Sequence, residues 1–142
     1  MLKKATLFLL TLTILLCSCG VGYAAENPEQ IVSVKTSNDV RMLYVSFTDC
    51  NLDVHANGLA EMYGSVNAKP GVDRVKISMY LQRYNNGWST VKHWVNEYKG
   101  TYGSMNKSYY VTKGYTYRVL VYFYAFEGSE SESTYSIDEE WY

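Results

Sequence analysis

The chain has 142 residues, which is room for one domain, and its apolar share of 47% is ordinary for a globular protein. Without Lys3 and Lys4 at its start, it carries 11 basic and 14 acidic residues, a net charge of −3. A mildly acidic surface gives no electrostatic reason to bind nucleic acid or anionic lipid, so we expect neither as a partner.

The first 24 residues have the pattern of a signal peptide. A positive start precedes the apolar run 5–16, which is too short to cross a bilayer as a permanent helix. Residues 22–24 (Gly-Tyr-Ala) form a small-x-small site that would be cut before Ala25. Residues 16–19 (Leu-Cys-Ser-Cys) resemble a lipobox, which would leave Cys19 as a lipidated N-terminus. We favour the first site. Either one places the folded part outside the cytoplasm, secreted or lipid-anchored at the cell surface.

One cysteine, Cys50, remains after a cut before Ala25, so an intramolecular disulfide is impossible. We expect Cys50 to be buried, since cysteine outside a disulfide is among the most buried residue types; pairing with another chain is the alternative. The polar stretch 25–50 is interpreted as a partly extended lead-in, and 51–142 as the folded domain.

Short runs of strand-forming residues, separated by turn signals, fill the domain. The 15 tyrosines against 4 phenylalanines suit half-buried sheet surfaces. The pattern predicts an all-β fold, either a sandwich or a barrel, and we expect a single antiparallel β-sandwich of about seven strands. Hairpins are predicted at Asn57-Gly58 and Asn86-Gly87. The predicted strands are 40–47, 51–55, 59–66, 75–84, 88–98, 107–111, 117–126 and 135–137, with a loop at 99–104 and a turn at 128–134.

Two runs in the middle of the chain predict how their strands lie. Apolar residues at every second position from Val75 to Leu81 predict one buried face. The run 117–126 is apolar on both faces, which is typical of a central strand. The run 88–98 fits no single period of two, so either a bulge near Val91 shifts it or one tryptophan faces solvent. Its spacing also fits a helix, although its β-branched residues and the preceding turn favour a strand.

The segment from Val111 through Gly114 to Tyr117 resembles the corner before the sixth strand of fibronectin type III domains. In those domains the tyrosine hydroxyl returns to the backbone of the preceding loop. The resemblance implies an immunoglobulin-like or fibronectin-III-like sandwich with Gly114 and Tyr117 as its structural corner. The sequence departs from the pattern in having Lys113 where a proline is usual, and in lacking the tryptophan of the second strand.

The whole chain also resembles a family of small, tyrosine-rich exported proteins of Gram-positive bacteria. The shared pattern is found at Leu81-Gln82, Gly87–Ser89 and Gly114–Arg118. This resemblance supports the fold and implies no activity.

Few residues could carry catalysis. Asp53 and His55 lie close to Cys50 in the sequence and His93 could join them, but Cys50 falls on the opposite face of the predicted strand. We therefore assign no catalytic residue and interpret both histidines as surface or structural residues. No metal-ligand spacing is present, so we expect neither a metal nor a cofactor.

Five aromatic residues lie on two strands that are predicted to be neighbours: Tyr80, Tyr84, Trp88, Trp94 and Tyr98. If they share an exposed face, they form a platform on which sugar rings could stack. The alternative is that these rings close the sandwich or pair across strands.

Our first hypothesis is a non-enzymatic binding or adhesion module outside the cytoplasm, with a glycan or a surface protein as its partner. A secreted toxin or bacteriocin-like effector is the alternative, although no basic amphipathic stretch that would attack a membrane is present. A hydrolase is the third and weakest reading.

Overall fold

The computed structural model describes residues 36–37 and 42–142, with side chains from residue 42 onward. The predicted signal peptide and both of its processing sites, including Cys19, lie outside this part. Within the described residues there is no helix, and hence none that is long and apolar enough to span a membrane.

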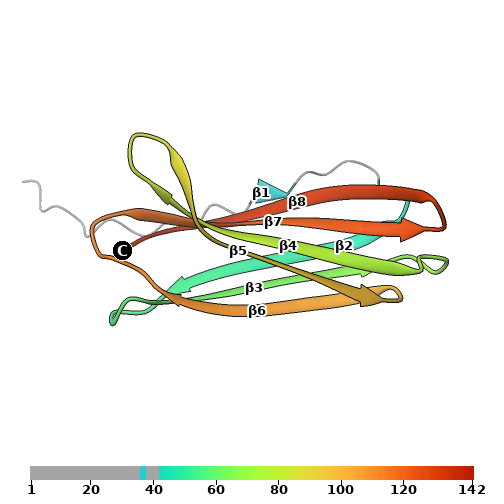
Figure 1. Cartoon of the computed structure of the whole chain (residues 1–142), viewed down its shortest axis with the longest axis horizontal. Helices are drawn as coiled ribbons and strands as arrows, with labels where there is room; N and C mark the ends of the chain where they lie inside the picture. Colours follow the sequence, from blue (N-terminus) through green and yellow to red (C-terminus); the bar gives the residue numbers. More distant parts are fainter. Residues whose placement is uncertain (1–35, 38–41) are drawn as a thin grey trace, which may run out of the picture. The chain divides into compact units, whose positions relative to one another are not determined.

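Two antiparallel sheets pack against each other and enclose the core (Figure 1). One sheet has the strand order β1-β8-β7-β4-β5 and the other has the order β2-β3-β6. The expectation of an all-β antiparallel sandwich is confirmed. The strands are β1 (Thr36–Ser37), β2 (Val45–Val54), β3 (Leu59–Ala68), β4 (Arg74–Tyr84), β5 (Trp88–Lys99), β6 (Tyr102–Tyr110), β7 (Thr116–Glu127) and β8 (Glu130–Trp141).

Strands β4 and β7 supply the centre of the core. The alternate residues of β4 from Val75 to Leu81 are wholly buried, as their period of two predicts. β7 lies between β4 and β8, so the prediction of a central strand is also confirmed. Burying each large side chain stabilises the fold by roughly 1.5–3 kcal/mol. The opposite sheet contributes Cys50, Leu52, Val54, Met62, Val66 and Met105.

Strand β2 is a single continuous strand where the sequence predicts two. It begins at Val45, within the stretch interpreted as a lead-in. The pairing with β3 shifts between Val45 and Phe47, which is a bulge. In a regular strand Leu43, Val45 and Phe47 would share one face, but here Val45 is buried while Leu43 and Phe47 are exposed.

Two other strands are longer than predicted. Strand β6 occupies part of the predicted loop 99–104. Strand β8 occupies most of the predicted turn 128–134 and continues beyond the predicted strand 135–137 to Trp141. The sequence of β6 shows no clear alternation of apolar and polar residues, because one of its inward residues is Gly103. The sequence of β8 does not alternate between apolar and polar residues either, because its inward residues are polar. Their hydrogen-bond partners belong to a distant strand, β2.

The run 88–98 forms strand β5 and not a helix. Leu81 pairs with Lys92 and Gln82 pairs with Thr90, so Val91 is an extra residue in a bulge. A bulge reverses the alternation beyond it. Trp88 and Trp94 consequently lie on opposite faces of the sheet, although they are six positions apart and would share a face in a regular strand.

Tyr117 ties the start of β7 to the loop before it. Its ring is buried, and its hydroxyl donates to the Thr112 carbonyl at 2.8 Å and accepts from the Thr112 amide at 3.1 Å. Gly114 lies between them with a φ of +91°, in the left-handed region that glycine adopts without strain. The hydroxyl of Tyr117 thus returns to the backbone of the preceding loop.

Side chains of β8 bind the open edge of β2. The Glu132 carboxylate accepts from the Leu43, Tyr44 and Val45 amides at 2.7–2.9 Å. Asp138, which is buried, accepts from the Leu52 amide at 2.8 Å. These bonds satisfy backbone donors that the β2–β3 pairing leaves free. Two further contacts continue the series, from Ser136 to Thr48 and from Glu140 to Val54.

The two glutamates of this series have opposite pKa shifts. Burial acts to raise the pKa of Glu132, but the three amides and the charge of Lys69 outweigh it, so that the pKa lies below the usual 4.5. Burial raises the pKa of Glu140 above 4.5, and the charges of Asp53 and Asp138 act in the same direction. Glu132 is thus stabilised as a carboxylate, whereas the ionisation of Glu140 opposes folding.

We expect Tyr117→Phe to lower the free energy of unfolding by about 1–3 kcal/mol, because both backbone groups of Thr112 lose their partner. Denaturant unfolding measures this. The control is Tyr115→Phe, whose hydroxyl makes no hydrogen bond to a described residue; an equal loss in both variants would contradict the role of the corner.

We expect Glu132→Gln to destabilise the protein by roughly 1.5–3 kcal/mol at pH 7. The carboxylate accepts from three backbone amides through two oxygens, whereas the glutamine amide is neutral and has only one oxygen. The pKa of Glu132 is lowered in the folded state, so its contribution is present above pH 4.5 and is lost as the pH falls through the folded pKa.

Glu140→Gln is the matched control. The glutamine keeps an acceptor for the single Val54 amide. It removes the carboxylate, whose pKa is raised in the folded state. The penalty from that charge appears as the pH rises through the folded pKa. We expect this variant to be as stable as the parent, or more stable, at pH 7, and the two to converge below pH 4.5. Equal destabilisation by both substitutions would contradict the assignment.

Candidate functional site

The five aromatic residues of the predicted platform do not share one face. Tyr80, Tyr84 and Trp88 lie on the outer face of the five-stranded sheet, where Tyr84 pairs with Trp88. Trp94 and Tyr98 pair with Met79 and Val75, which are core residues, so they point inward. On β5, the bulge at Val91 puts Trp88 on the outer face and Trp94 and Tyr98 on the inner one.

Trp94 and Tyr98 close the sandwich along the edge formed by β5. Both are partly buried and pack against the core. The Tyr98 hydroxyl donates to the Ser104 carbonyl of β6, and its ring leaves no room for a side chain at position 103: a Cβ there would lie 2.5 Å from the ring. Trp94 and Tyr98 therefore close the sandwich and are not part of an exposed platform.

A polar row crosses four strands on the outer face. The Arg118 guanidinium donates to Gln82 Oε1 at 2.8 Å and lies 3.7 Å from a carboxylate oxygen of Glu139. Gln82 in turn donates to the Thr90 hydroxyl at 3.2 Å. The same guanidinium lies 4.1 Å from the Trp88 ring centroid, which is cation–π geometry. One face of Trp88 is therefore covered.

Neighbouring side chains on the outer face also contact one another across the strands. The rings of Tyr80 and His93 stack at 4.0 Å between centroids, and His93 Nε2 lies 2.8 Å from the Ser78 hydroxyl. Tyr122 meets Tyr80 edge-on at 6.0 Å. The histidine that was considered for a catalytic group thus pairs across strands.

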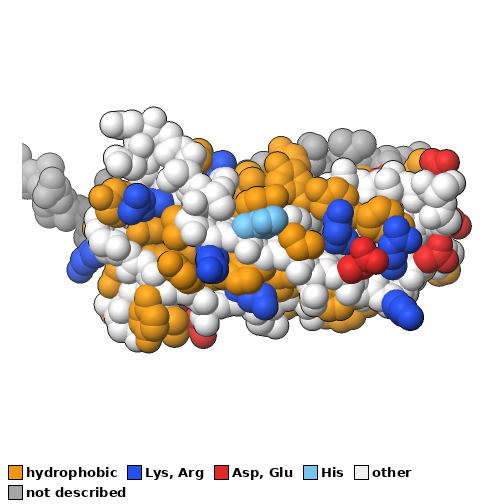
Figure 2. Space-filling model, viewed as in Figure 1, with side chains coloured by type: hydrophobic (Ala, Val, Ile, Leu, Met, Phe, Trp, Pro, Cys, Tyr) orange, Lys and Arg blue, Asp and Glu red, His pale blue; other side chains and the backbone are white. Residues whose placement is uncertain are grey.

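Two cations cover the aromatic rings at the other end of the outer face. Lys76 Nζ lies 4.0 Å from the Tyr124 centroid, and the Arg74 guanidinium lies 4.2 Å from that of Phe126. Arg74 also pairs with Glu97 at 3.1 Å. In the view of Figure 2, Lys and Arg side chains lie among hydrophobic ones, and most acidic side chains gather toward the right-hand end. Sequence reasoning missed these cations, although Lys76 and Arg118 alternate with core residues and so had to face outward.

The residues considered for catalysis are dispersed. Cys50 is buried on the inner face of β2, as expected, whereas Asp53 is exposed on the outer face and His55 follows the end of that strand. His93 belongs to the other sheet. Among the described residues, no three His, Cys, Asp or Glu side chains form a group that could hold a metal ion.

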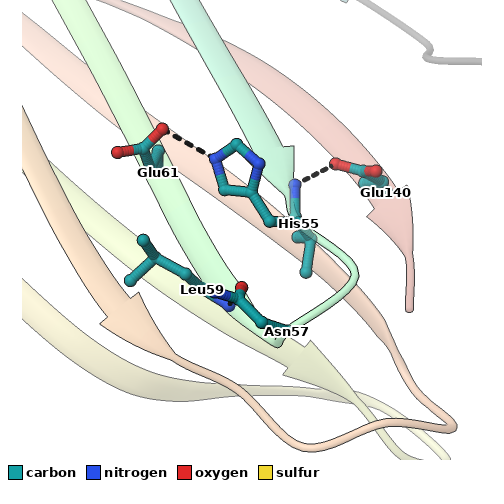
Figure 3. A network of polar contacts seen from close by, with 6 residues as sticks. His55, Asn57, Leu59, Glu61 and Glu140 are labelled. Carbon is teal, nitrogen blue, oxygen red and sulfur yellow. Dashed lines mark hydrogen bonds and ion pairs between the residues drawn. The ribbon is translucent and has the colours of Figure 1, made fainter.

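His55 is held by a neighbouring strand. Its Nε2 lies 2.7 Å from a carboxylate oxygen of Glu61 on β3, and the Val54 amide binds Glu140 beside it (Figure 3). The hydrogen bond to Glu61 raises the pKa of His55 above 6.5, with smaller contributions from Asp53 and Glu140. The turn that follows is the predicted Asn57-Gly58 hairpin.

The fold defines the chain as an antiparallel β-sandwich. No protein-family model matches the chain, and no curated protein or solved structure matches it.

We expect Glu61→Gln to lower the pKa of His55 toward 6.5, because it removes the carboxylate that favours the imidazolium. NMR titration of the imidazole carbon-bound protons measures this. Glu97→Gln removes a carboxylate on the other sheet and should leave that titration unchanged. A His55 pKa that does not respond to Glu61→Gln would contradict the pairing.

Proposed function

We propose that the protein is an exported, non-enzymatic binding module of the immunoglobulin and fibronectin III sandwich class, and that it binds a surface protein. Export rests on the signal-peptide pattern of the first 24 residues. The proposed contact surface is the outer face of the five-stranded sheet.

The strand order supports this class. Counted from β2, the first, second and fifth strands form one sheet, and the third, fourth, sixth and seventh form the other. The corner at Tyr117 then precedes the sixth strand, where the sequence resemblance puts it. The motif and the topology are independent of each other, because one is local and the other is a property of the whole chain.

The observation that carries the proposed function is the pairing of cations with aromatic rings on an outer face that no described segment covers. Tyr, Trp and Arg are the residues that contribute most to protein–protein interfaces. Glu97 and Glu139 are each paired with an arginine on this face, which leaves the ammonium of Lys76 without a carboxylate partner among the described residues. The excess positive charge favours an acidic partner surface.

The ring faces also distinguish between the two kinds of partner considered. A sugar platform needs open ring faces, whereas Arg118 covers one face of Trp88 and His93 covers one face of Tyr80. What remains is a surface of paired cations and rings, with the exposed Tyr84 beside it. Such a mixed, partly rigid surface favours a protein over a glycan.

Binding of the purified protein to cells of the producing organism tests the proposed function. We expect Trp88→Ala and Arg118→Ala each to weaken binding by about tenfold or more, since such residues form the energetic centre of interfaces. The matched control is Tyr102→Ala, which removes an aromatic side chain that is 57% exposed on the other sheet. Thermal unfolding of each variant separates lost contacts from lost stability.

Treating the cells before binding identifies the partner. Protease treatment should abolish binding, and periodate oxidation of the glycans should leave it intact. The opposite result would establish a glycan partner and overturn the proposed one. Equal binding by Tyr102→Ala and Trp88→Ala would show that the aromatic–cation face is not the contact surface.

A further inference from the structure

The outer face of the three-stranded sheet is hollowed by an open depression of about 380 Å³. Residues that pair across neighbouring strands point to the same face, so two adjacent rows supply most of its lining. One row is Asn51, Tyr63 and Asn106, and the other is Asp53, Glu61 and Ser108.

The depression has open hydrogen-bonding capacity. The side chains of Asn51, Tyr63, Asn106 and Ser108 make no hydrogen bond to any other described residue. The two amides offer donors and acceptors, and the two hydroxyls can do either. On the other sheet, by contrast, the amide of Gln82 is engaged on both of its sides. A ligand of this depression must therefore both donate and accept at several points.

The charges around the depression restrict the ligand further. Asp53 and Glu61 contribute two carboxylates and Lys107 one ammonium, and Glu61 is already paired with His55 (Figure 3). With Glu61 paired with His55, the charges of Asp53 and Lys107 oppose each other, so the lining has no excess positive charge that would attract an anionic ligand. A carboxylate such as Asp53 accepts from hydroxyl groups. Tyr63 adds an aromatic ring against which an apolar ring face can pack.

We propose that this depression binds a neutral oligosaccharide, with Tyr63 under a sugar ring and Asn51, Asp53 and Asn106 on its hydroxyl groups. Neutral sugars combine what the lining requires: adjacent hydroxyls that both donate and accept, apolar C–H faces, and no charge. The open, strand-lined shape suits a chain of sugars, which can extend beyond the depression. The site lies on the opposite side of the sandwich from the proposed protein-binding face, and either can exist without the other.

Titration of the purified, isotope-labelled protein with maltotetraose, cellotetraose, mannotetraose and tetra-N-acetylchitotetraose tests this. At least one of these neutral probes should shift the backbone amide signals of Asn51, Tyr63 and Asn106 with a dissociation constant of about 1 mM or tighter. Tyr63→Ala and Asn106→Ala should each weaken that binding about tenfold. Tyr102→Ala lies on the same strand as Asn106 but outside the depression, and should bind as the parent does.

Three outcomes would overturn the proposal. The first is no binding by any of the four probes up to about 10 mM, a concentration that would half-saturate even a very weak site. The second is tighter binding of tetragalacturonate than of every neutral probe, since the lining has no excess positive charge that would attract it. The third is loss of binding in Trp88→Ala with retention in Tyr63→Ala, which would place the sugar on the other sheet.

Discussion

The sandwich depends on the way in which β8 closes the open edge of β2. An edge strand carries backbone groups that its own sheet does not satisfy, and leaving a buried one unsatisfied costs about 1–3 kcal/mol. Inward-facing carboxylates of β8 accept from that edge, most clearly Glu132 on three successive amides and Asp138 on the Leu52 amide. The two sheets are thereby joined by hydrogen bonds along one side, in addition to the apolar core between them.

The two outer faces of the same sandwich have acquired opposite chemistry. On the five-stranded sheet, polar groups bind one another and cations lie on aromatic rings, as Arg118 does on Trp88. On the three-stranded sheet, amide and hydroxyl groups around Tyr63 make no hydrogen bond to the other residues that the structure describes. Inward residues of both sheets serve the common core, so only the outward residues are free to differ. This division lets one small domain present two distinct surfaces.

The bulge at Val91 decides which aromatic residues are available for binding. Before it Trp88 faces outward, and after it Trp94 and Tyr98 seal the edge of the core. The spacing of the apolar residues in 88–98 signalled a break in the alternation, but it was equally compatible with one exposed tryptophan or with a helix. Only the pairing with β4, which matches Gln82 to Thr90 and Leu81 to Lys92, locates the extra residue.

Local features of the sequence determined the all-β class, the hairpins, the buried face of β4, the central place of β7 and the corner at Tyr117, because each depends on neighbouring residues or on a period of two. The tertiary structure decided the full length of β6 and β8, the cations on the aromatic rings and the depression around Tyr63. In each of these, the residues that meet come from strands far apart in the chain. In the sequence, Asp138 is one of several acidic residues near position 140 and nothing marks it as buried. Only the tertiary structure brings it next to the Leu52 amide, 86 residues earlier.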